Sequence, residues 1–208
     1  MNKGNIVIVD YGMGNLYSVY YKLKKLYRHV IISSCADEIM DASKIILPGV
    51  GHFATGMKHI KERNLLTPLQ KKVMEEKVPV LGICLGMQLM TIYSEEGNTE
   101  GLGWFDATTI KFDKSKLNRL KIPHMGWNNI HKNENESPIL NGINEESMFY
   151  FVHSYYVLCK DKTDILCTTN YDFSFTSGII KENRIGVQFH PEKSHEYGMQ
   201  ILKNFIDI

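Results

Sequence analysis

The segment Val80–Gln88, with the sequence VLGICLGMQ, constrains the fold more than any other part of the chain. Its apolar run ends in Gly-x-Cys-x-Gly and continues at once into residues typical of a helix. This pattern is the cysteine form of a nucleophile elbow, a strained strand-to-helix turn that lifts one side chain above the edge of a sheet. Gly82 and Gly86 leave room that larger side chains would fill. We therefore predict that Cys84 is a nucleophile at the end of a buried strand.

A second argument concerns the reactivity of Cys84. The start of the following helix directs free N–H groups and a positive dipole end towards the sulfur, and both favour the thiolate. A lone cysteine is more often a buried core residue than a reactive one. The flanking glycines favour the reactive alternative, which requires a base, an orienting acid and an oxyanion hole elsewhere in the chain.

The base and the acid are expected in the segment Gly186–Glu192, GVQFHPE. Residues Ile185–Phe189 are typical of a buried strand, which would deliver His190 at its end. A general base must approach the nucleophile to about 3 Å, as residues at the ends of neighbouring strands can do. Glu192 can accept a hydrogen bond from the second imidazole nitrogen and fix the tautomer. The predicted triad is therefore Cys84, His190 and Glu192.

Together, GICLGMQ and QFHPEKS resemble the class I (triad-type) glutamine amidotransferases, which hydrolyse the side-chain amide of glutamine and pass ammonia to a partner active site. Within that family, further segments resemble the glutaminase subunits of imidazole glycerol phosphate synthases. These segments are DYGMGNL (Asp10–Leu16), ILPGVG (Ile46–Gly51), SEEG (Ser94–Gly97), PHMGWN (Pro123–Asn128) and YFVHSYY (Tyr150–Tyr156). The resemblance covers essentially the whole chain.

The resemblance implies one glutaminase domain over residues 1–208, with a flavodoxin-like open mixed sheet, mostly parallel, and helices on both faces. It implies glutamine as the substrate, no metal or organic cofactor, and a (β/α)8-barrel cyclase as the partner. The backbone N–H groups of Val50 and Leu85 would form the oxyanion hole. The implied substrate-binding residues are Gly51, Gln88, Glu96, Ser154 and Tyr155. The implied partner-facing residues are Trp127, Asn128 and Lys193.

Several of the implied residues have a plainer structural alternative. Residues Pro48–Gly51 could be an ordinary glycine-rich turn, and Gln88 could be a helix-surface amide. Glu96, which would bind the substrate ammonium, could be a solvated acid, and Lys193 a solvated lysine. Backbone groups of Ser154 and Tyr155 are expected to bind the substrate carboxylate.

The order of elements favours an α/β fold. We expect strands at Asn5–Val9, His29–Ser33 and Lys44–Leu47, and helices at Asn15–Tyr27, Phe53–Arg63, Pro68–Lys77 and Glu196–Ile206. From Thr108 onward, strands separated by turns are expected to extend the parallel sheet with antiparallel members. Such sheets place their sites at the carboxyl ends of the strands. Met87, Leu89 and Met90 are expected in the core.

Composition narrows the classes of function. The net charge of +1 gives no indication of a nucleic-acid partner. No apolar run approaches the ~18 residues of a membrane-spanning helix, and the N-terminus enters a strand without the pattern of a signal peptide. The four cysteines, Cys35, Cys84, Cys159 and Cys167, lack metal-type spacing. A free catalytic thiol suits the reducing cytoplasm, where we expect the protein.

The chain departs from the family pattern around the substrate rim and the docking face. His195 follows HPEKS, where glycine is common, and Trp104 follows GLG. At these positions the sequence resembles paralogues of the glutaminase that are found with surface-polysaccharide genes. Three functions therefore stay open: a histidine-pathway glutaminase, a glutaminase that feeds ammonia to a surface sugar, and a catalytically silent regulatory partner. The intact Cys84, His190 and Glu192 favour an enzyme.

Overall fold

The computed structural model describes residues 4–116, 121–133 and 137–208. Its strands are β1 (Ile6–Val9), β2 (Val30–Ser33), β3 (Lys44–Leu47), β4 (Val80–Ile83), β5 (Thr91–Ser94), β6 (Thr99–Glu100), β7 (Phe105–Lys111), β8 (His124–Asn129), β9 (His131–Lys132), β10 (Met148–His153), β11 (Tyr155–Cys159), β12 (Ile165–Tyr171), β13 (Phe173–Lys181) and β14 (Arg184–Val187). Its α-helices are α1 (Leu16–Lys24), α2 (Ala36–Met40), α3 (Phe53–Glu62), α4 (Leu66–Gln70), α5 (Leu85–Leu89) and α6 (His195–Asp207). Short helical turns are η1 (Lys71–Glu75), η2 (Lys114–Lys116), η3 (Pro138–Leu140), η4 (Lys162–Asp164) and η5 (Pro191–Lys193).

One large mixed sheet organises the molecule. Its main path runs β2-β1-β3-β4-β14-β13-β11-β7-β5-β6, with β12 and β9 attached through β13. Strands β2, β1, β3, β4 and β14 are mutually parallel neighbours. Strands β13 and β11 continue the sheet antiparallel to their neighbours. The predicted mostly parallel sheet with later antiparallel members is therefore confirmed.

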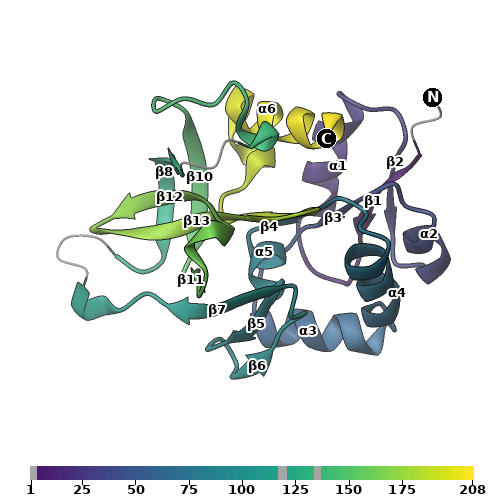
Figure 1. Ribbon diagram of the computed structural model, residues 1–208, viewed down its shortest axis with the longest axis horizontal. Helices are drawn as coiled ribbons and strands as arrows, with labels where there is room; N and C mark the ends of the chain where they lie inside the picture. The colour runs from purple at the N-terminus through teal and green to yellow at the C-terminus, as the bar shows by residue number, and fades with distance from the viewer. Residues whose placement is uncertain (1–3, 117–120, 134–136) are drawn as a thin grey trace.

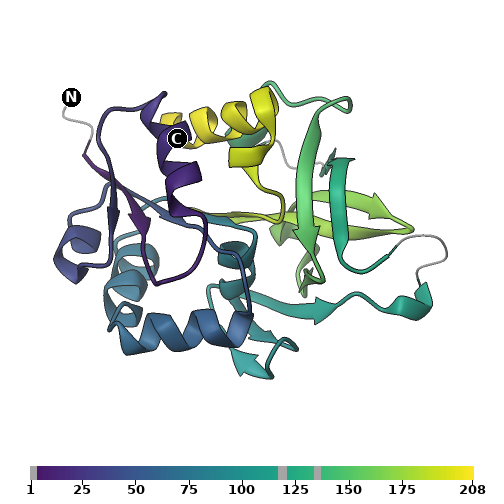
Figure 2. The same ribbon diagram turned by 180° about the vertical axis from the view of Figure 1, so that it is seen from behind.

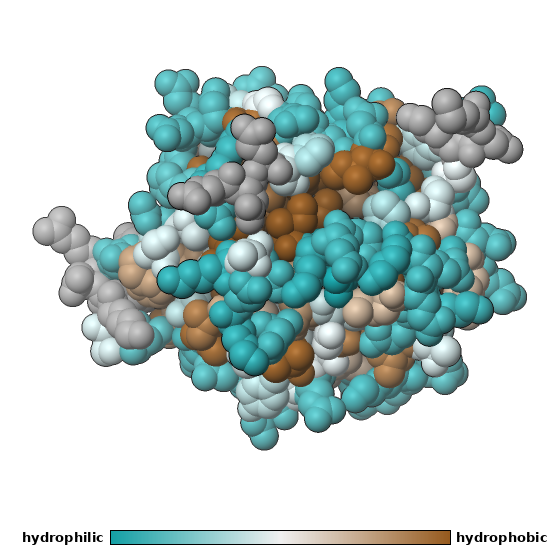
Figure 3. Space-filling view, viewed as in Figure 1, coloured by the Kyte–Doolittle hydropathy of each residue, from teal (hydrophilic) through white to brown (hydrophobic). Residues whose placement is uncertain are grey.

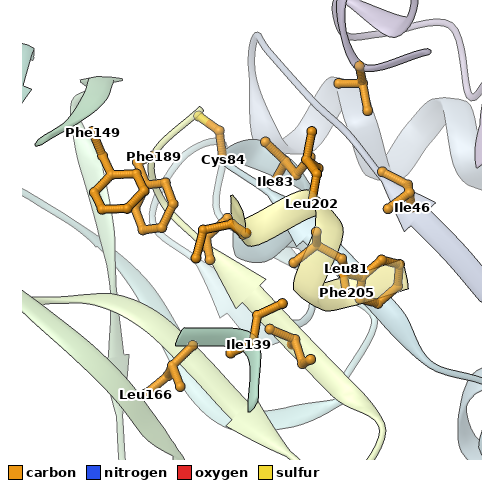
Figure 4. Close-up of a cluster of buried hydrophobic side chains, with 14 of the residues drawn as sticks. Ile46, Leu81, Ile83, Cys84, Ile139, Phe149, Leu166, Phe189, Leu202 and Phe205 are labelled. Carbon is orange, nitrogen blue, oxygen red and sulfur yellow. The ribbon is translucent and has the colours of Figure 1, made fainter. Parts of the chain in front are cut away.

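Helices cover both faces of this sheet (Figures 1 and 2). Helices α1 and α6 lie on one face, and α3, α4 and α5 lie on the other. Each face has its own buried apolar cluster, one around Leu23 and Phe205 and the other around Phe53 and Leu69. Figure 4 shows the first cluster, with Cys84 at its margin. Burying apolar residues on both faces is what parallel strands require, and it explains their nearly continuous hydrophobic runs.

Polar side chains dominate the surface seen in Figure 3, with apolar residues gathered in a hollow near its middle. Met87, Leu89 and Met90 are fully buried, as expected. Among the described residues, no helix has the length and apolar character needed to cross a membrane.

The predicted element boundaries differ from the structure at several ends. The helix expected at Asn15–Tyr27 ends at Lys24, and the one expected at Pro68–Lys77 is α4 followed by the π-turn η1. Helix α2 was not predicted, because its five residues are too few to show a helical period. The final helix runs one residue beyond the expected range at each end.

A close approach between β3 and the turn after β4 explains the glycines of the elbow. A Cβ on Gly86 would lie 1.7 Å from the Leu47 carbonyl oxygen. One on Gly82 would lie 2.7 Å from the Met90 methyl carbon and 2.8 Å from the Gly86 backbone. Backbone atoms cannot move aside as side chains do, so only glycine fits at position 86.

We predict that Gly86→Ala destabilises the protein by more than about 3 kcal/mol, because the new methyl group overpacks against backbone. Gly56→Ala is the matched control. Its Cβ would meet only side-chain atoms, of Leu89 at 3.3 Å and of Tyr11 at 3.5 Å, among its three nearest contacts. Alanine is also the better helix former by about 1 kcal/mol. Urea unfolding of both variants measures the difference, and equal stabilities would contradict the proposed role of Gly86.

Candidate active site

Two neighbouring parallel strands bring the predicted triad together. Ile83 at the end of β4 pairs with Val187 at the end of β14. The Cys84 N–H donates a hydrogen bond of 2.8 Å to the Val187 carbonyl oxygen. The chain reaches His190 three residues beyond β14. Residues distant in sequence therefore meet at the carboxyl edge of the sheet, as the fold class predicts.

Cys84 occupies the strained turn that its sequence predicts. Its backbone has φ 53° and ψ −109°, a conformation that non-glycine residues rarely adopt. Strain of this kind costs about 1–3 kcal/mol and persists only where the surroundings impose it. The side chain is 6% exposed, and its sulfur accepts a hydrogen bond of 3.6 Å from Gln188 Nε2. The sulfur is thus hydrogen-bonded to a neighbouring side chain at the wall of a pocket.

His190 and Glu192 form a buried pair behind the cysteine. His190 Nδ1 lies 2.8 Å from Glu192 Oε1. The His190 backbone is fixed on both sides, because its N–H donates to Tyr150 O at 2.9 Å and its carbonyl accepts from Ser194 Oγ at 2.6 Å. Nε2 has no hydrogen-bond partner among the described residues. The imidazole therefore has one nitrogen held by a carboxylate and the other free to exchange a proton.

The pKa of His190 reflects both its burial and its two neighbours. Burial alone lowers this pKa, but the Cys84 sulfur and the Glu192 carboxylate outweigh burial and raise it to about 10. Opposite charges nearby stabilise the protonated form. His190 is thus a strong proton acceptor, and Glu192 stabilises the imidazolium that forms when His190 takes up a proton.

A pocket of about 310 Å³ opens in front of Cys84. It is lined by every residue for which a substrate or oxyanion role was expected, together with Cys84 and three further residues. The lining consists of Val50, Gly51, Cys84, Leu85, Gln88, Glu96, Pro123, Val152, His153, Ser154 and Tyr155. Its volume falls at the lower end of the range for small-molecule sites.

The two expected oxyanion residues, Val50 and Leu85, line the same pocket as Cys84. Leu85 is the first residue of α5, where backbone N–H groups have no partner within the helix. Val50 lies in the segment that leaves β3, next to the elbow. A Cβ on Gly49 in that segment would lie 3.0 Å from the Gly86 nitrogen, so the two turns are in contact. Val50 and Leu85 both line the pocket, and their role as oxyanion donors stays a prediction.

The substrate residues are more constrained than the sequence indicates. Gln88 is buried, and its Nε2 donates 3.0 Å hydrogen bonds to Tyr155 O and to Gln188 Oε1. A Glu96 carboxylate oxygen accepts a bond of 2.8 Å from the Phe53 N–H at the start of α3. Glu96 is therefore held by a helix terminus and not freely solvated. The Tyr155 carbonyl is already engaged inside the protein.

Sequence reasoning missed three buried polar residues around the site: Gln188, His124 and His153. Gln188 contacts the Cys84 sulfur directly. Its position two residues before His190 was a usable signal, because alternate strand residues share a face. The histidines pair across two strands, and no sequence pattern gives that register.

The expected partner-facing residues lie in different environments. Trp127 is 43% exposed, and its ring stacks on His195 with centroids 4.9 Å apart. Lys193 is exposed, with its Nζ 5.5 Å from the Tyr150 ring. Asn128 is half-buried, and its side chain points inward to bond Asn170 O at 2.9 Å. Trp127 and Lys193 are therefore exposed to solvent, whereas Asn128 is half-buried with its side chain hydrogen-bonded within the protein.

The stacking explains one departure from the family pattern. His195 has φ 46°, in the left-handed region that glycine adopts most easily. Histidine is tolerated at this position, and its ring covers one face of Trp127.

Comparison with known proteins agrees with this geometry. A sequence model of the family "Glutamine amidotransferase class-I" matches residues 7–208, so the chain belongs to that family. It is 52% identical over 201 residues to imidazole glycerol phosphate synthase subunit HisH 2 of Methanococcus maripaludis, covering 97% of this chain and 98% of the relative. It is 46% identical to the subunit of the same name from Pseudomonas aeruginosa, covering 98% and 99%.

The fold also matches solved structures. PurLQS from Thermotoga maritima superimposes with a TM-score of 0.75 at 17% identity, covering 99% of this chain and 98% of the other. The glutaminase domain of Trypanosoma brucei CTPS, solved with bound acivicin, superimposes with a TM-score of 0.69 at 16% identity, covering 97% and 92%. These similarities support the same fold.

We predict that Glu192→Gln lowers glutaminase kcat by roughly 100-fold or more, with little change in KM. The amide can still accept from Nδ1 but no longer supplies the charge that raises the His190 pKa. Steady-state kinetics of the synthase complex measure both constants. Glu196→Gln, which changes an exposed carboxylate in the first turn of α6, should leave them unchanged. Unchanged kcat in Glu192→Gln would contradict the orienting role.

Proposed function

We propose that this chain is the glutaminase subunit of an imidazole glycerol phosphate synthase, which hydrolyses glutamine and supplies ammonia to a cyclase subunit in histidine biosynthesis. One observation carries the chemistry. A strained cysteine at the wall of a pocket lies next to a buried histidine, whose far nitrogen is bound by a carboxylate. The names of relatives with 52% and 46% identity support the pathway.

The reaction follows from the positions of these groups. Cys84 loses its proton to His190, and the thiolate attacks the carboxamide carbon of glutamine. The N–H groups of Val50 and Leu85 stabilise the oxyanion, and loss of one such donor typically costs about 3 kcal/mol. The imidazolium of His190 then protonates the leaving ammonia. Water activated by His190 hydrolyses the thioester and releases glutamate.

The rest of the pocket selects the substrate. Glu96 offers negative charge to the α-ammonium group of glutamine, and backbone groups at Ser154 and Tyr155 face its α-carboxylate. Gln88 has both amide hydrogens engaged, so its Oε1 is the atom left to accept a bond from the substrate. A ligand with an amide, an ammonium and a carboxylate fits this set of groups.

The partner proposed for this subunit is a (β/α)8-barrel cyclase. An exposed surface near the site suits docking: Met125, Trp127 and Met148 expose apolar side chains on the ribbon of β8 and β10, beside Lys193. Aromatic residues and methionine are enriched at protein interfaces.

We predict that Cys84→Ala abolishes glutamine-dependent turnover of the complex but leaves turnover with added ammonium salts nearly intact, because the acceptor site lies on the partner. Cys35→Ala, at an exposed cysteine, is the matched control and should keep both activities. Normal glutaminase activity in Cys84→Ala would overturn the proposal.

The identity of the ammonia acceptor is tested in the same turnover assay by exchanging the synthase subunit that is added. Reconstitution with an imidazole glycerol phosphate synthase cyclase should give glutamine-dependent product formation. Stimulation only by a sugar-amidating synthase would replace the histidine pathway with the surface-polysaccharide alternative and leave the glutaminase chemistry unchanged.

We further predict that the isolated subunit is nearly inactive, and that a partner with bound acceptor raises kcat far more than it lowers KM. The glycine-rich Pro48–Gly51 segment can rest with its amide turned away from the oxyanion position, and docking can favour the competent arrangement. Kinetics of the lone chain and of the complex, with and without acceptor ligand, measure this. Trp127→Ala should weaken activation, whereas Tyr21→Ala, at an exposed residue of α1, should not. Full activity of the lone chain would contradict the gating.

A further inference from the structure

A chain of hydrogen bonds runs through the wall of the pocket and ends at the Cys84 sulfur. It starts on the ribbon of β8 and β10, where the register places His124 opposite His153. His124 Nδ1 lies 3.0 Å from His153 Nε2, and His153 Nδ1 lies 2.8 Å from Tyr155 O. Both rings are buried, at 2% and 5% exposure.

The partners at each end fix the tautomers of both rings. A carbonyl can only accept, so His153 Nδ1 carries the proton, and Nε2 of a neutral His153 must accept from His124 Nδ1. His124 Nε2 is then an acceptor, and the Asn128 amide lies 3.4 Å from it as the donor. Burial lowers the pKa of His124 to about 4. Burial, with a smaller contribution from His124, lowers that of His153 to about 3.

The second half of the chain leads from Tyr155 to the sulfur. The same carbonyl oxygen accepts from Gln88 Nε2, whose other hydrogen bonds Gln188 Oε1. This leaves the Gln188 Nε2 group to donate to Cys84 Sγ. Each group in this series of hydrogen bonds therefore has a single role as donor or acceptor, from the ribbon of β8 and β10 to the Cys84 sulfur.

We propose that His124 and His153 are positioning residues of the glutaminase site. The neutral pair holds the Tyr155 carbonyl, which orients the Gln88 amide, and Gln88 in turn orients Gln188 so that it donates to the Cys84 sulfur. A donor at that point stabilises the thiolate. The kinetic test of this proposal rests on the proposed glutaminase function. The rate of Cys84 alkylation tests the proposal on the isolated subunit, without a cyclase partner.

The experiment compares His153→Phe with His153→Asn. Phenylalanine keeps a ring but removes both nitrogens. Asparagine keeps an amide donor near the position of Nδ1. We expect His153→Phe to slow alkylation of Cys84 by iodoacetamide at neutral pH roughly tenfold, and to lower glutaminase kcat similarly with a smaller change in KM. His153→Asn should recover most of both rates.

Two controls separate positioning from packing. Cys35 is exposed and reports the general reactivity of thiols, so peptide mapping by mass spectrometry should find its rate unchanged in every variant. Phe112→Leu removes a ring contact with His153, at 5.3 Å between centroids, but leaves the His124–His153–Tyr155 hydrogen bonds in place. It should lower the unfolding temperature without slowing the Cys84 reaction.

His124→Phe breaks the chain one step earlier and can still stack on Phe151. It should slow Cys84 alkylation in the same direction but less, and it decides the question if His153→Phe fails to fold. The proposal is overturned if His153→Phe, or the folded His124→Phe, reacts at the wild-type rate, or if Phe112→Leu slows alkylation as much as His153→Phe. A wild-type protein without glutaminase activity in any complex would overturn the function but not the effect on the thiol.

Discussion

The close contact between Gly86 and the carbonyl oxygen of Leu47 sets the relative positions of β3, the turn after β4 and Cys84. It seats the turn after β4 directly against the end of β3 and leaves no room for a side chain. The same contact places the Pro48–Gly51 segment, which leaves β3 at that point, beside Cys84. Backbone contacts therefore set the position of Cys84 relative to Val50 and Leu85, the proposed oxyanion donors, and backbone holds position better than flexible side chains. The strain at Cys84 is sustained because packing on both sides imposes it.

The interior of the site is polar, although it lies between two apolar clusters. Buried amides and imidazoles are costly unless each finds a partner. Here Gln88, Gln188, His124 and His153 satisfy one another through the Tyr155 carbonyl, with the Cys84 sulfur at one end and the Asn128 amide at the other. Such a network permits few arrangements, because changing one donor leaves another group unpaired. It stabilises the geometry of the pocket, where apolar packing alone would leave rotamers free.

The proposed docking surface and the proposed triad share a short stretch of chain. Turn η5 carries Glu192 towards His190 and exposes Lys193, and the next residue, Ser194, bonds both the His190 carbonyl and the Tyr150 N–H. His195 then stacks on Trp127 of the ribbon. A partner that docked on Trp127 or Lys193, as proposed, would touch residues adjacent to His190. This continuity gives a physical route by which docking can act on catalysis.

The sequence by itself determined the elbow, the succession of strands and helices, and the residues Cys84, His190 and Glu192, because glycine spacing and apolar runs are local signals of backbone geometry. It did not determine that Glu96 is held by the first turn of α3, that Asn128 points inward, or that Gln188 contacts the sulfur. Nor did it give the register that joins His124 to His153. Those features depend on which strands pair and at what offset, and only the packed tertiary structure sets that offset.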